Sequence, residues 1–243
     1  MSEPSPHPVF TQCPVLHQDA HLIVIQKPPG VLSHPNQSGD KERCAFEGRY
    51  DLEKKCFRGK AGSVWLVHRL DQDTSGILMG ALNEDTAKRC REAFESGLVS
   101  KTYRALLLGL PNKDGTWRDA LVTQRQKGRV RAVVQAGGRP NAELHFRVLS
   151  QNRTRRIALV EIDLITGRTH QIRVQAASRH LPVLGDDVYG DFGQNRLFRK
   201  NAGIRRLCLH ACRITMPHPQ KGKPITLNCP EPPEWASLAE GRT

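Results

Sequence analysis

The chain has 243 residues, 38% of them hydrophobic and 25% charged, which is long enough for one large domain or two small ones. It has no run of about 20 apolar residues, which excludes a membrane-spanning helix of ordinary length. Its polar, proline-rich opening also lacks the pattern of a secretory signal peptide. With 37 Lys and Arg against 24 Asp and Glu, the formal net charge is +13. A charge of this size indicates either a solvated basic surface or an anionic partner such as a nucleic acid.

The distribution of the basic residues helps to decide between these two interpretations. Nine Lys and Arg stand against one acid, Glu143, between residues 121 and 160. Eight stand against none between residues 192 and 230. Clusters of one sign along the chain favour a polyphosphate partner over an evenly solvated surface.

The cysteines give no sign of a metal site. There are seven, without a CxxC pair and without the Cys/His spacing of a zinc finger, so we expect no metal. With no signal peptide, a reducing cytoplasmic location is expected. A disulfide between Cys44 and Cys56 is the less favoured alternative to free thiols.

The predicted elements of the first half begin after residues 1–14, which we expect to be disordered. An apolar strand over Leu22 to Gln26 ends at a Pro-Pro-Gly turn, and the polar segment 36–63 is expected to be a loop or a mobile insertion. Two more strands are predicted over 65–70 and 77–82. Asn83 is then a good N-cap for a helix over 84–96, with Ala87, Cys90 and Phe94 as its buried stripe and Gly97 as its stop.

The second half is mostly strands, predicted over 99–108, 142–149, 156–165, 207–214 and 224–227. One helix is expected over 170–180, capped by Thr169. Strands outnumber helices and do not alternate with them, which predicts an α+β fold with a largely antiparallel sheet. No linker divides the chain, so a single domain over 15–240 is expected.

A dense polar cluster, HRLDQDTSG, runs from His68 to Gly76 between two of the predicted strands. Asp, Thr, Ser and Gly are ordinary turn residues, so a plain turn is one interpretation. Against it, we place His68 and Arg69 in the strand itself, where a turn does not need them. Burying so many polar groups is costly unless their hydrogen bonds are satisfied or used, which favours a functional site.

A second cluster, GRTHQIR, runs from Gly167 to Arg173 and joins a predicted strand to a helix start. Free N–H groups at such a start favour an anion, and Arg173 lies one turn in from Thr169. A surface helix with ordinary basic residues is the alternative.

Together the two clusters resemble the RluA family of pseudouridine synthases, whose signatures are HRLDxxTSG and a later GRTHQIR motif. Three further segments match in the family's order: KTYRA at 101–105, LGDDVYG at 184–190 and LHA at 209–211. KPPGVLSHP at 27–35 is similar to the family's opening segment. Many relatives carry an S4 RNA-binding module before the catalytic domain, so this chain resembles a catalytic domain without that module.

The resemblance implies the pseudouridine-synthase fold, with a mixed, mainly antiparallel sheet and the active site in a central cleft. It also implies conversion of uridine in RNA to pseudouridine without a cofactor or metal. Asp71 takes the position of the family's catalytic aspartate, whereas Asp73 falls on a variable position. Arg173 is then expected to pair with Asp71, and Tyr103 to stack on the target base and to move a proton at its C5.

The same resemblance suggests roles in RNA binding for further residues of the two clusters. Arg69 is expected to fill the space that a flipped-out uridine leaves, and Ile172 to pack near the base. His68 is expected to fix the turn by hydrogen bonding rather than to act as an acid or base, and His170 similarly. The residues expected to contact or position the RNA are thus His68, Arg69, Thr74, Arg168, His170 and Ile172.

Two other classes of function compete with this hypothesis. A non-catalytic RNA-binding or assembly protein on the same scaffold has no chemical reason to keep Asp71, Tyr103 and Arg173 together. A carboxylate-based glycosidase needs an aromatic sugar platform, and aromatic residues make up only 5% of the chain. We therefore expect a monomeric enzyme that modifies ribosomal or transfer RNA, with the particular uridine left open.

Overall fold

The structure is a computed structural model that describes residues 10–36, 38–126 and 129–241. The chain forms two compact units where an undivided domain was expected. The first unit comprises the chain up to Val99 together with Ile214–Cys229, and the second comprises Ser100–Arg213 with the segment from Pro230 onward. No helix in the described part of the chain is long and apolar enough to cross a membrane.

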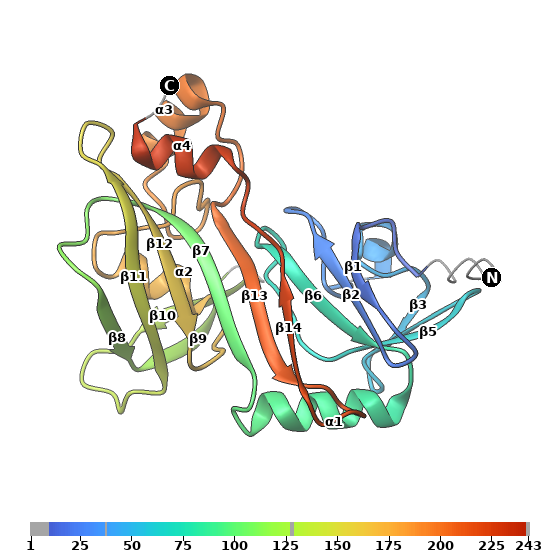
Figure 1. Cartoon of the computed structure of the whole chain (residues 1–243). Coiled ribbons are helices and arrows are strands. Elements are labelled where there is room, and N and C mark those ends of the chain that lie inside the picture. Colours follow the sequence, from blue (N-terminus) through green and yellow to red (C-terminus); the bar gives the residue numbers. More distant parts are fainter. Residues whose placement is uncertain (1–9, 37, 127–128, 242–243) are drawn as a thin grey trace. The chain divides into compact units, whose positions relative to one another are not determined.

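The first unit is built on antiparallel strand pairs (Figure 1). Its strands before the first helix are β1 (Val15–Gln18), β2 (Leu22–Lys27), β3 (Arg49–Asp51), β4 (Cys56–Gly59), β5 (Gly62–Leu66) and β6 (Ser75–Ala81). β2 pairs with β1 on one side and β6 on the other, and β5, β4 and β3 follow outward from β6. The end of β13 (Leu209–Pro217) and β14 (Pro224–Asn228) complete this unit.

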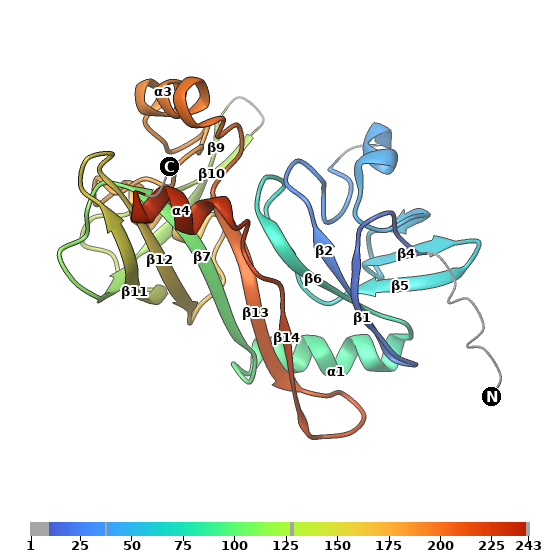
Figure 2. The same ribbon diagram turned by 45° about the horizontal axis from the view of Figure 1, so that its top comes forward.

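The polar segment 36–63 was expected to be a loop or a mobile insertion. In the structure it forms a small folded layer. It contains a 3₁₀ turn (η1, Ser38–Arg43), both β3 and β4, and the start of β5; Figure 2 shows β4 and β5 side by side. Phe46 and Phe57 are both buried and their rings lie 6.0 Å apart. Two aromatic side chains in an otherwise polar stretch were the signal for a core.

The expected disorder of residues 1–14 is wrong for the part that the structure describes, and residues 1–9 lie outside it. Phe10 and Thr11 are buried. The carbonyl of Phe10 accepts a hydrogen bond from the backbone N–H of Glu47 at 2.8 Å. The start of the described chain is therefore tied to the 36–63 layer.

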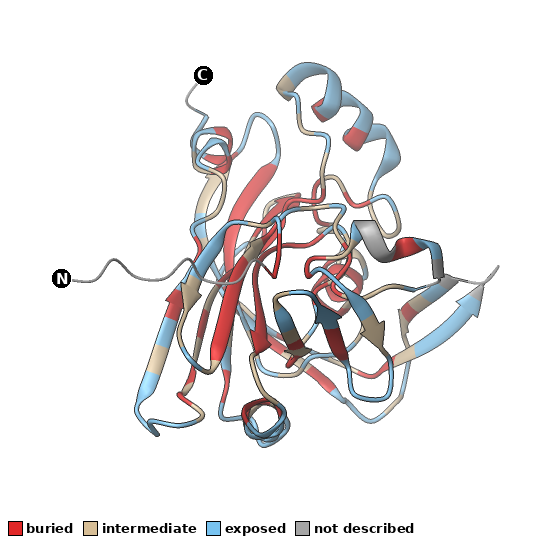
Figure 3. Ribbon diagram, turned by 90° about the vertical axis from the view of Figure 1, so that its right-hand side faces the viewer, coloured by how far each residue is buried: buried red, intermediate tan, exposed pale blue. Residues whose placement is uncertain are grey.

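The helix α1 (Glu84–Glu95) begins and ends as the sequence predicts. The side chain of Asn83 accepts a hydrogen bond from Thr86 N at 2.9 Å, and Gly97 follows with φ of +75°. Ala87 and Cys90 are fully buried, whereas Phe94 is half-buried. Buried and exposed residues are both visible on this helix where Figure 3 shows it end on.

The second unit contains an antiparallel sheet in the order β7-β12-β11-β8. These strands are β7 (Ser100–Leu108), β8 (Gly115–Asp119), β11 (Ala142–Asn152) and β12 (Ile157–Leu164). A separate hairpin pairs β9 (Leu121–Gln126) with β10 (Arg129–Val134). β8, β9 and β10 were not among the strands predicted from the sequence.

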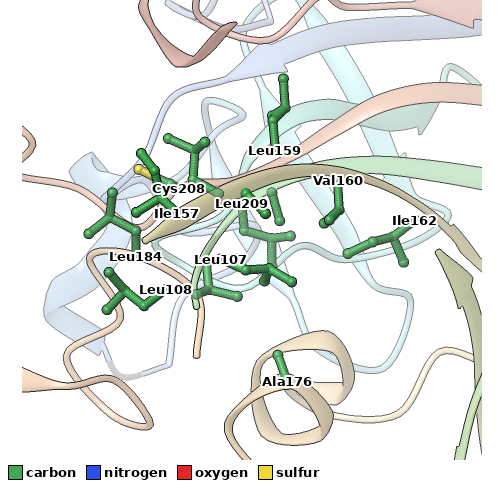
Figure 4. Packing of buried hydrophobic residues seen from close by; sticks show 14 of the residues in the cluster. Leu107, Leu108, Ile157, Leu159, Val160, Ile162, Ala176, Leu184, Cys208 and Leu209 are labelled. Carbon is green, nitrogen blue, oxygen red and sulfur yellow. The ribbon is translucent and has the colours of Figure 1, made fainter. Parts of the chain in front are cut away.

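Three helices are described in the second unit: α2 (Gln171–Ala177), α3 (Phe192–Ala202) and α4 (Glu234–Glu240). Apolar residues of β7, β12 and the start of β13 form its core, to which α2 adds Ala176 (Figure 4). Trp235 of α4 is fully buried in the same core. The fold is α+β with mainly antiparallel pairing, as predicted.

The start of α2 differs from the prediction. The residue before the helix is His170, not Thr169, and it lies in the left-handed region with φ of 52° and makes no side-chain cap. The carboxamide oxygen of Gln171 instead accepts hydrogen bonds from Arg168 N at 3.0 Å and from Thr166 Oγ1 at 2.8 Å. The Gln171 side chain thus binds the backbone just before this seven-residue helix. The anion site predicted at the helix start is therefore not supported.

Candidate active site

The loop that carries Asp71 is fixed on both sides of that residue. Ser33 Oγ donates a hydrogen bond to Leu70 O at 2.9 Å and accepts one from Leu70 N at 3.0 Å. On the other side, Gln72 O accepts from Lys27 Nζ at 2.7 Å and from Gly30 N at 3.0 Å. Lys27 at the end of β2, with Gly30 and Ser33 just after it, therefore acts as a clamp on the backbone of the loop.

Lys27 is the centre of this clamp. Its side chain is fully buried, and Nζ also donates to Pro28 O at 3.0 Å and to Val31 O at 2.7 Å. A buried ammonium group is tolerated only when strong acceptors surround it, and here backbone carbonyls provide them. The sequence analysis did not single out Lys27, although it begins the KPPGVLSHP segment.

The two aspartates of the loop have different environments. Asp71 is half-buried, and its carbonyl accepts a hydrogen bond from Thr74 N at 3.2 Å, whereas Asp73 is exposed. Thr74 itself is buried. The loop thus holds Asp71 in a closed turn and leaves Asp73 toward solvent.

His68 and Arg69 lie in irregular chain after β5 and not in a strand, which corrects the prediction. The Nε2 atom of His68 accepts a hydrogen bond from Met79 N of β6 at 3.1 Å, and its ring stacks on Phe94 at 5.0 Å. A ring nitrogen that accepts a backbone hydrogen bond in this way supports a role for His68 in fixing the loop.

Arg69 is exposed and contacts His34, which precedes the 36–63 layer in the chain. Its Nη1 lies 3.4 Å from His34 Nε2. The His34 ring in turn stacks on Tyr50 of β3, with centroids 5.7 Å apart and an interplanar angle of 15°. Tyr50 packs on Phe57 at 4.8 Å, so Arg69 is connected to the buried aromatic core of that layer.

Arg173 is buried in the second unit beside a carboxylate that the sequence analysis did not name. Its Nε donates to Asp186 Oδ2 at 2.7 Å and its Nη2 to Asp186 Oδ1 at 2.9 Å. Burial raises the pKa of Asp186, but the hydrogen bonds and charge of Arg173 and the backbone N–H groups of Tyr189 and Val188 outweigh it. The pKa of Asp186 therefore lies below its usual value, and the pair is ionic.

Tyr189 connects this ion pair to the hairpin. Its hydroxyl accepts a hydrogen bond from Ala132 N of β10 at 2.8 Å and lies 2.9 Å from His170 Nδ1. The guanidinium groups of Arg131 and Arg173 lie 4.9 Å and 5.4 Å from its ring centre. Burial raises the pKa of Tyr189, which keeps it a neutral phenol.

The other predicted residues of the second unit have mixed positions. Tyr103 lies on β7 opposite Ile162 and packs, partly buried, against the core. Ile172 belongs to that core and is only 4% exposed, which favours packing over contact with a base. Arg168 is exposed, and its Nε donates to Asn141 O at 3.0 Å.

The predicted residues are thus divided between the two units. His68, Arg69, Asp71 and Thr74 belong to the first, and Tyr103, Arg168, His170, Ile172 and Arg173 to the second. Within the described ranges, no group of three or more His, Cys, Asp or Glu could hold a metal ion. Cys44 and Cys56 are free thiols, so the disulfide alternative is wrong.

Comparison with known proteins shows the family of this chain. A profile of the RNA pseudouridylate synthase family matches residues 21–178. The chain belongs to this family. It is 34% identical over 232 residues to an uncharacterized RNA pseudouridine synthase, YhcT, of Bacillus subtilis. The match covers 95% of this chain and 72% of that protein.

Two further relatives have names that state different RNAs. The tRNA pseudouridine synthase C of Yersinia pestis is 31% identical over 92% of this chain and 88% of its own length. The ribosomal large subunit pseudouridine synthase D of Nitrosomonas europaea is 34% identical over 93% of this chain and 64% of its own.

A solved human structure, RNA pseudouridylate synthase domain containing 4, matches with a TM-score of 0.67 at 28% identity, over 91% of this chain and 90% of that one. Family membership makes this chain an enzyme of the pseudouridine synthase class, which are isomerases that act on RNA.

Proposed function

We propose that this enzyme converts particular uridines of transfer or ribosomal RNA to pseudouridine, with Asp71 as the catalytic carboxylate. The observation that carries the assignment is the clamp on the Asp71 loop. Hydrogen bonds from Ser33, Gly30 and Lys27 fix the residues on either side of Asp71. A carboxylate that acts on a sugar or base must be aimed as well as charged, and a fixed backbone supplies the aim.

The proposed reaction is an isomerisation, so its atoms balance without another reactant. The bond from N1 of the base to C1′ of the ribose breaks, the base rotates, and C5 bonds to C1′. The hydrogen on C5 leaves as a proton, and N1 gains one. Asp71 acts in the first step as a nucleophile, as a stabiliser of developing charge, or as the base that leads to a glycal.

Tyr103 and Arg173 are proposed to act on the same uridine. Tyr103 would stack on the base and carry the proton from C5. Arg173 would keep the Asp71 carboxylate ionised and oriented, and its five N–H donors allow this because Asp186 uses two of them. Arg69 would occupy the space left by the flipped nucleotide. We place the enzyme in the cytoplasm, as a monomer, with its active site in a central cleft.

The decisive experiment is pseudouridine mapping in cells with and without this gene. Total RNA would be treated with carbodiimide, which marks pseudouridine, and stops in primer extension would be compared. A site lost with the gene and restored by the wild-type enzyme, but not by Asp71→Asn, is the expected result. A restored site with Asp71→Asn would contradict the catalytic assignment. If no tRNA or rRNA site depended on the gene, the proposed substrate would be wrong.

A further inference from the structure

The helix α3 of the second unit shows most of its surface to solvent. Only Asn195 and Phe198 are buried, and Phe192 is 61% exposed. Phe192, Arg196, Arg199 and Lys200 have the spacing i, i+4, i+7 and i+8, which places them on one face of the helix. We call this set the basic face of α3. The helix is drawn in orange in Figure 2.

The cations of the basic face are available for a partner. Among the residues that the structure describes, Arg196, Arg199 and Lys200 make no side-chain hydrogen bond or ion pair, and all three are exposed. The sequence has no acid from residue 192 to residue 230 that could neutralise them. Arg199 and Lys200 lie in the last turn, where cations stabilise the helix dipole. That effect does not account for Arg196 or for the exposed ring of Phe192.

The helix is rigidly connected to the segment that holds Arg173. Asn195 Nδ2 donates to Asp186 O at 3.0 Å, and Asn195 Oδ1 accepts from Gly185 N at 2.9 Å. The helix begins at an Asp191 N-cap that accepts from Gln194 N at 2.9 Å. The backbone of Asp186, whose carboxylate pairs with Arg173, therefore also fixes the basic face.

From these observations we infer that the basic face of α3 is a docking surface for the substrate RNA outside the target uridine. Arg196, Arg199 and Lys200 would contact phosphates, and Phe192 would stack on an unpaired base. An aromatic ring among unpaired cations has the composition of a surface for single-stranded nucleic acid. The inference rests on the proposed function for the identity of the partner, and it adds a contact that the catalytic motifs do not provide.

The test compares two triple variants with equal loss of charge. The first is Arg196→Gln, Arg199→Gln and Lys200→Gln. The control is Lys54→Gln, Lys60→Gln and Lys88→Gln, three exposed lysines of the other unit. Filter binding to purified bulk tRNA, and separately to bulk rRNA, would be measured from about 50 to 300 mM salt. Loss of three phosphate contacts is expected to reduce the slope of log affinity against log salt by about 2.

The expected result is a rise in dissociation constant of about tenfold or more for the α3 variant at roughly 100 mM salt, with the control within about threefold of wild type. An equal effect in both variants would overturn the inference, as would no effect in the α3 variant. Phe192→Ala is expected to weaken binding more than Leu197→Ala, which removes the other exposed apolar side chain of α3. Equal effects of these two would refute the stacking role.

Pseudouridine formation at saturating RNA separates this inference from the proposed function. The α3 variants should reach the wild-type turnover, because the basic face is not assigned to the chemistry. If the wild-type enzyme formed no pseudouridine in either RNA, the proposed function would fail, while the affinities would still decide the role of α3.

Discussion

Arg173 and Asp186 form a two-pronged ion pair in the interior of the second unit, through contacts of 2.7 and 2.9 Å. Both residues are almost fully buried, at 4% and 1% exposed. The pair fixes the plane of the guanidinium before RNA binds. The Asp186 carboxylate therefore sets the orientation of the Arg173 side chain within the second unit.

The first prediction concerns Asp71, the proposed catalytic carboxylate. Asp71→Asn should reduce pseudouridine formation by more than about a thousandfold, because loss of a covalent or charged catalyst removes several kcal/mol of transition-state stabilisation. Tritium release from RNA labelled at C5 of uridine measures this. Asp73→Asn is the matched control, since Asp73 is exposed on the same loop, and it should stay within about tenfold of wild type. Exchanged behaviour of the two variants would show that the other acid is the catalyst.

The second prediction concerns the planar geometry of Arg173. Arg173→Lys keeps the charge but cannot make two parallel hydrogen bonds to Asp186. Turnover at saturating RNA should fall by about a hundredfold, since one misplaced group near the chemistry has effects of that order. The dissociation constant should change little, which single-turnover rates and filter binding together would show. A phosphate contact would give the reverse outcome, with weaker binding and normal saturated turnover.

The third prediction is a dependence of stability on pH. Because the pKa of Asp186 is lower in the folded state, its contribution to stability is present above its unfolded-state pKa of about 3.9. The contribution is lost as the pH falls through the lower, folded-state value. The free energy of unfolding should therefore decrease on acidification below about pH 5.

Asp186→Asn should flatten this decrease, because its amide does not titrate. It should cost about 3 to 5 kcal/mol at neutral pH, because the buried Arg173 loses the charge of the Asp186 carboxylate. Urea unfolding at a series of pH values measures both effects. An unchanged profile in Asp186→Asn would contradict the role of the pair.

The fourth prediction concerns the clamp at Lys27. Lys27→Met removes the donor to three backbone carbonyls, including that of Gln72 beside Asp71. Saturated turnover should fall at least about tenfold, because the loop loses its fixed position. RNA affinity should remain within about threefold, since a fully buried ammonium makes no direct phosphate contact. Lys60→Met, at an exposed lysine, is the control. An equal fall in its saturated turnover would contradict the role of Lys27 as a clamp.

The fifth prediction compares two glycines with similar positive φ angles. Gly185 has φ of +78°, and a Cβ there would lie 1.9 Å from Arg206 O. Gly203 has φ of +68° with nothing within 4 Å of such a Cβ. Gly203→Ala should cost only about 1 kcal/mol of left-handed strain, whereas Gly185→Ala should cost about 4 kcal/mol or more. Thermal unfolding of the two variants measures the difference, and equal losses would contradict the clash.

Much of the strand pattern was predictable because it follows local hydrophobicity. β6, β7, β12 and α1 lie within about two residues of their expected bounds, since each has a continuous apolar face or a clear cap. The 36–63 layer was not predictable in the same way. Its strands β3 and β4 have only three and four residues. They are stabilised by ring contacts of Tyr50 with His34 and with Phe57, which the local hydrophobic pattern does not show.

The motif residues could be identified from the sequence, but their supporting contacts could not. Asp186 and Tyr189 lie in the LGDDVYG segment that carried part of the family resemblance, which was the available signal. Their partners, Arg173 and the N–H of Ala132, are determined by tertiary packing. Lys27 gave no signal of its own, because a single lysine at the end of a strand is usually solvated.

The strand β13 begins in one unit and ends in the other, so neither unit is a continuous piece of chain. The core of the first unit includes Ile214, Met216, Leu227 and Cys229 beside Leu22 and Val24. His218 also donates to Asp19, between β1 and β2, at 2.9 Å. During synthesis from the N-terminus, this core cannot close until residues 214–229 have left the ribosome. The loop that carries Asp71 therefore gains its final support only after roughly 140 further residues have been synthesised.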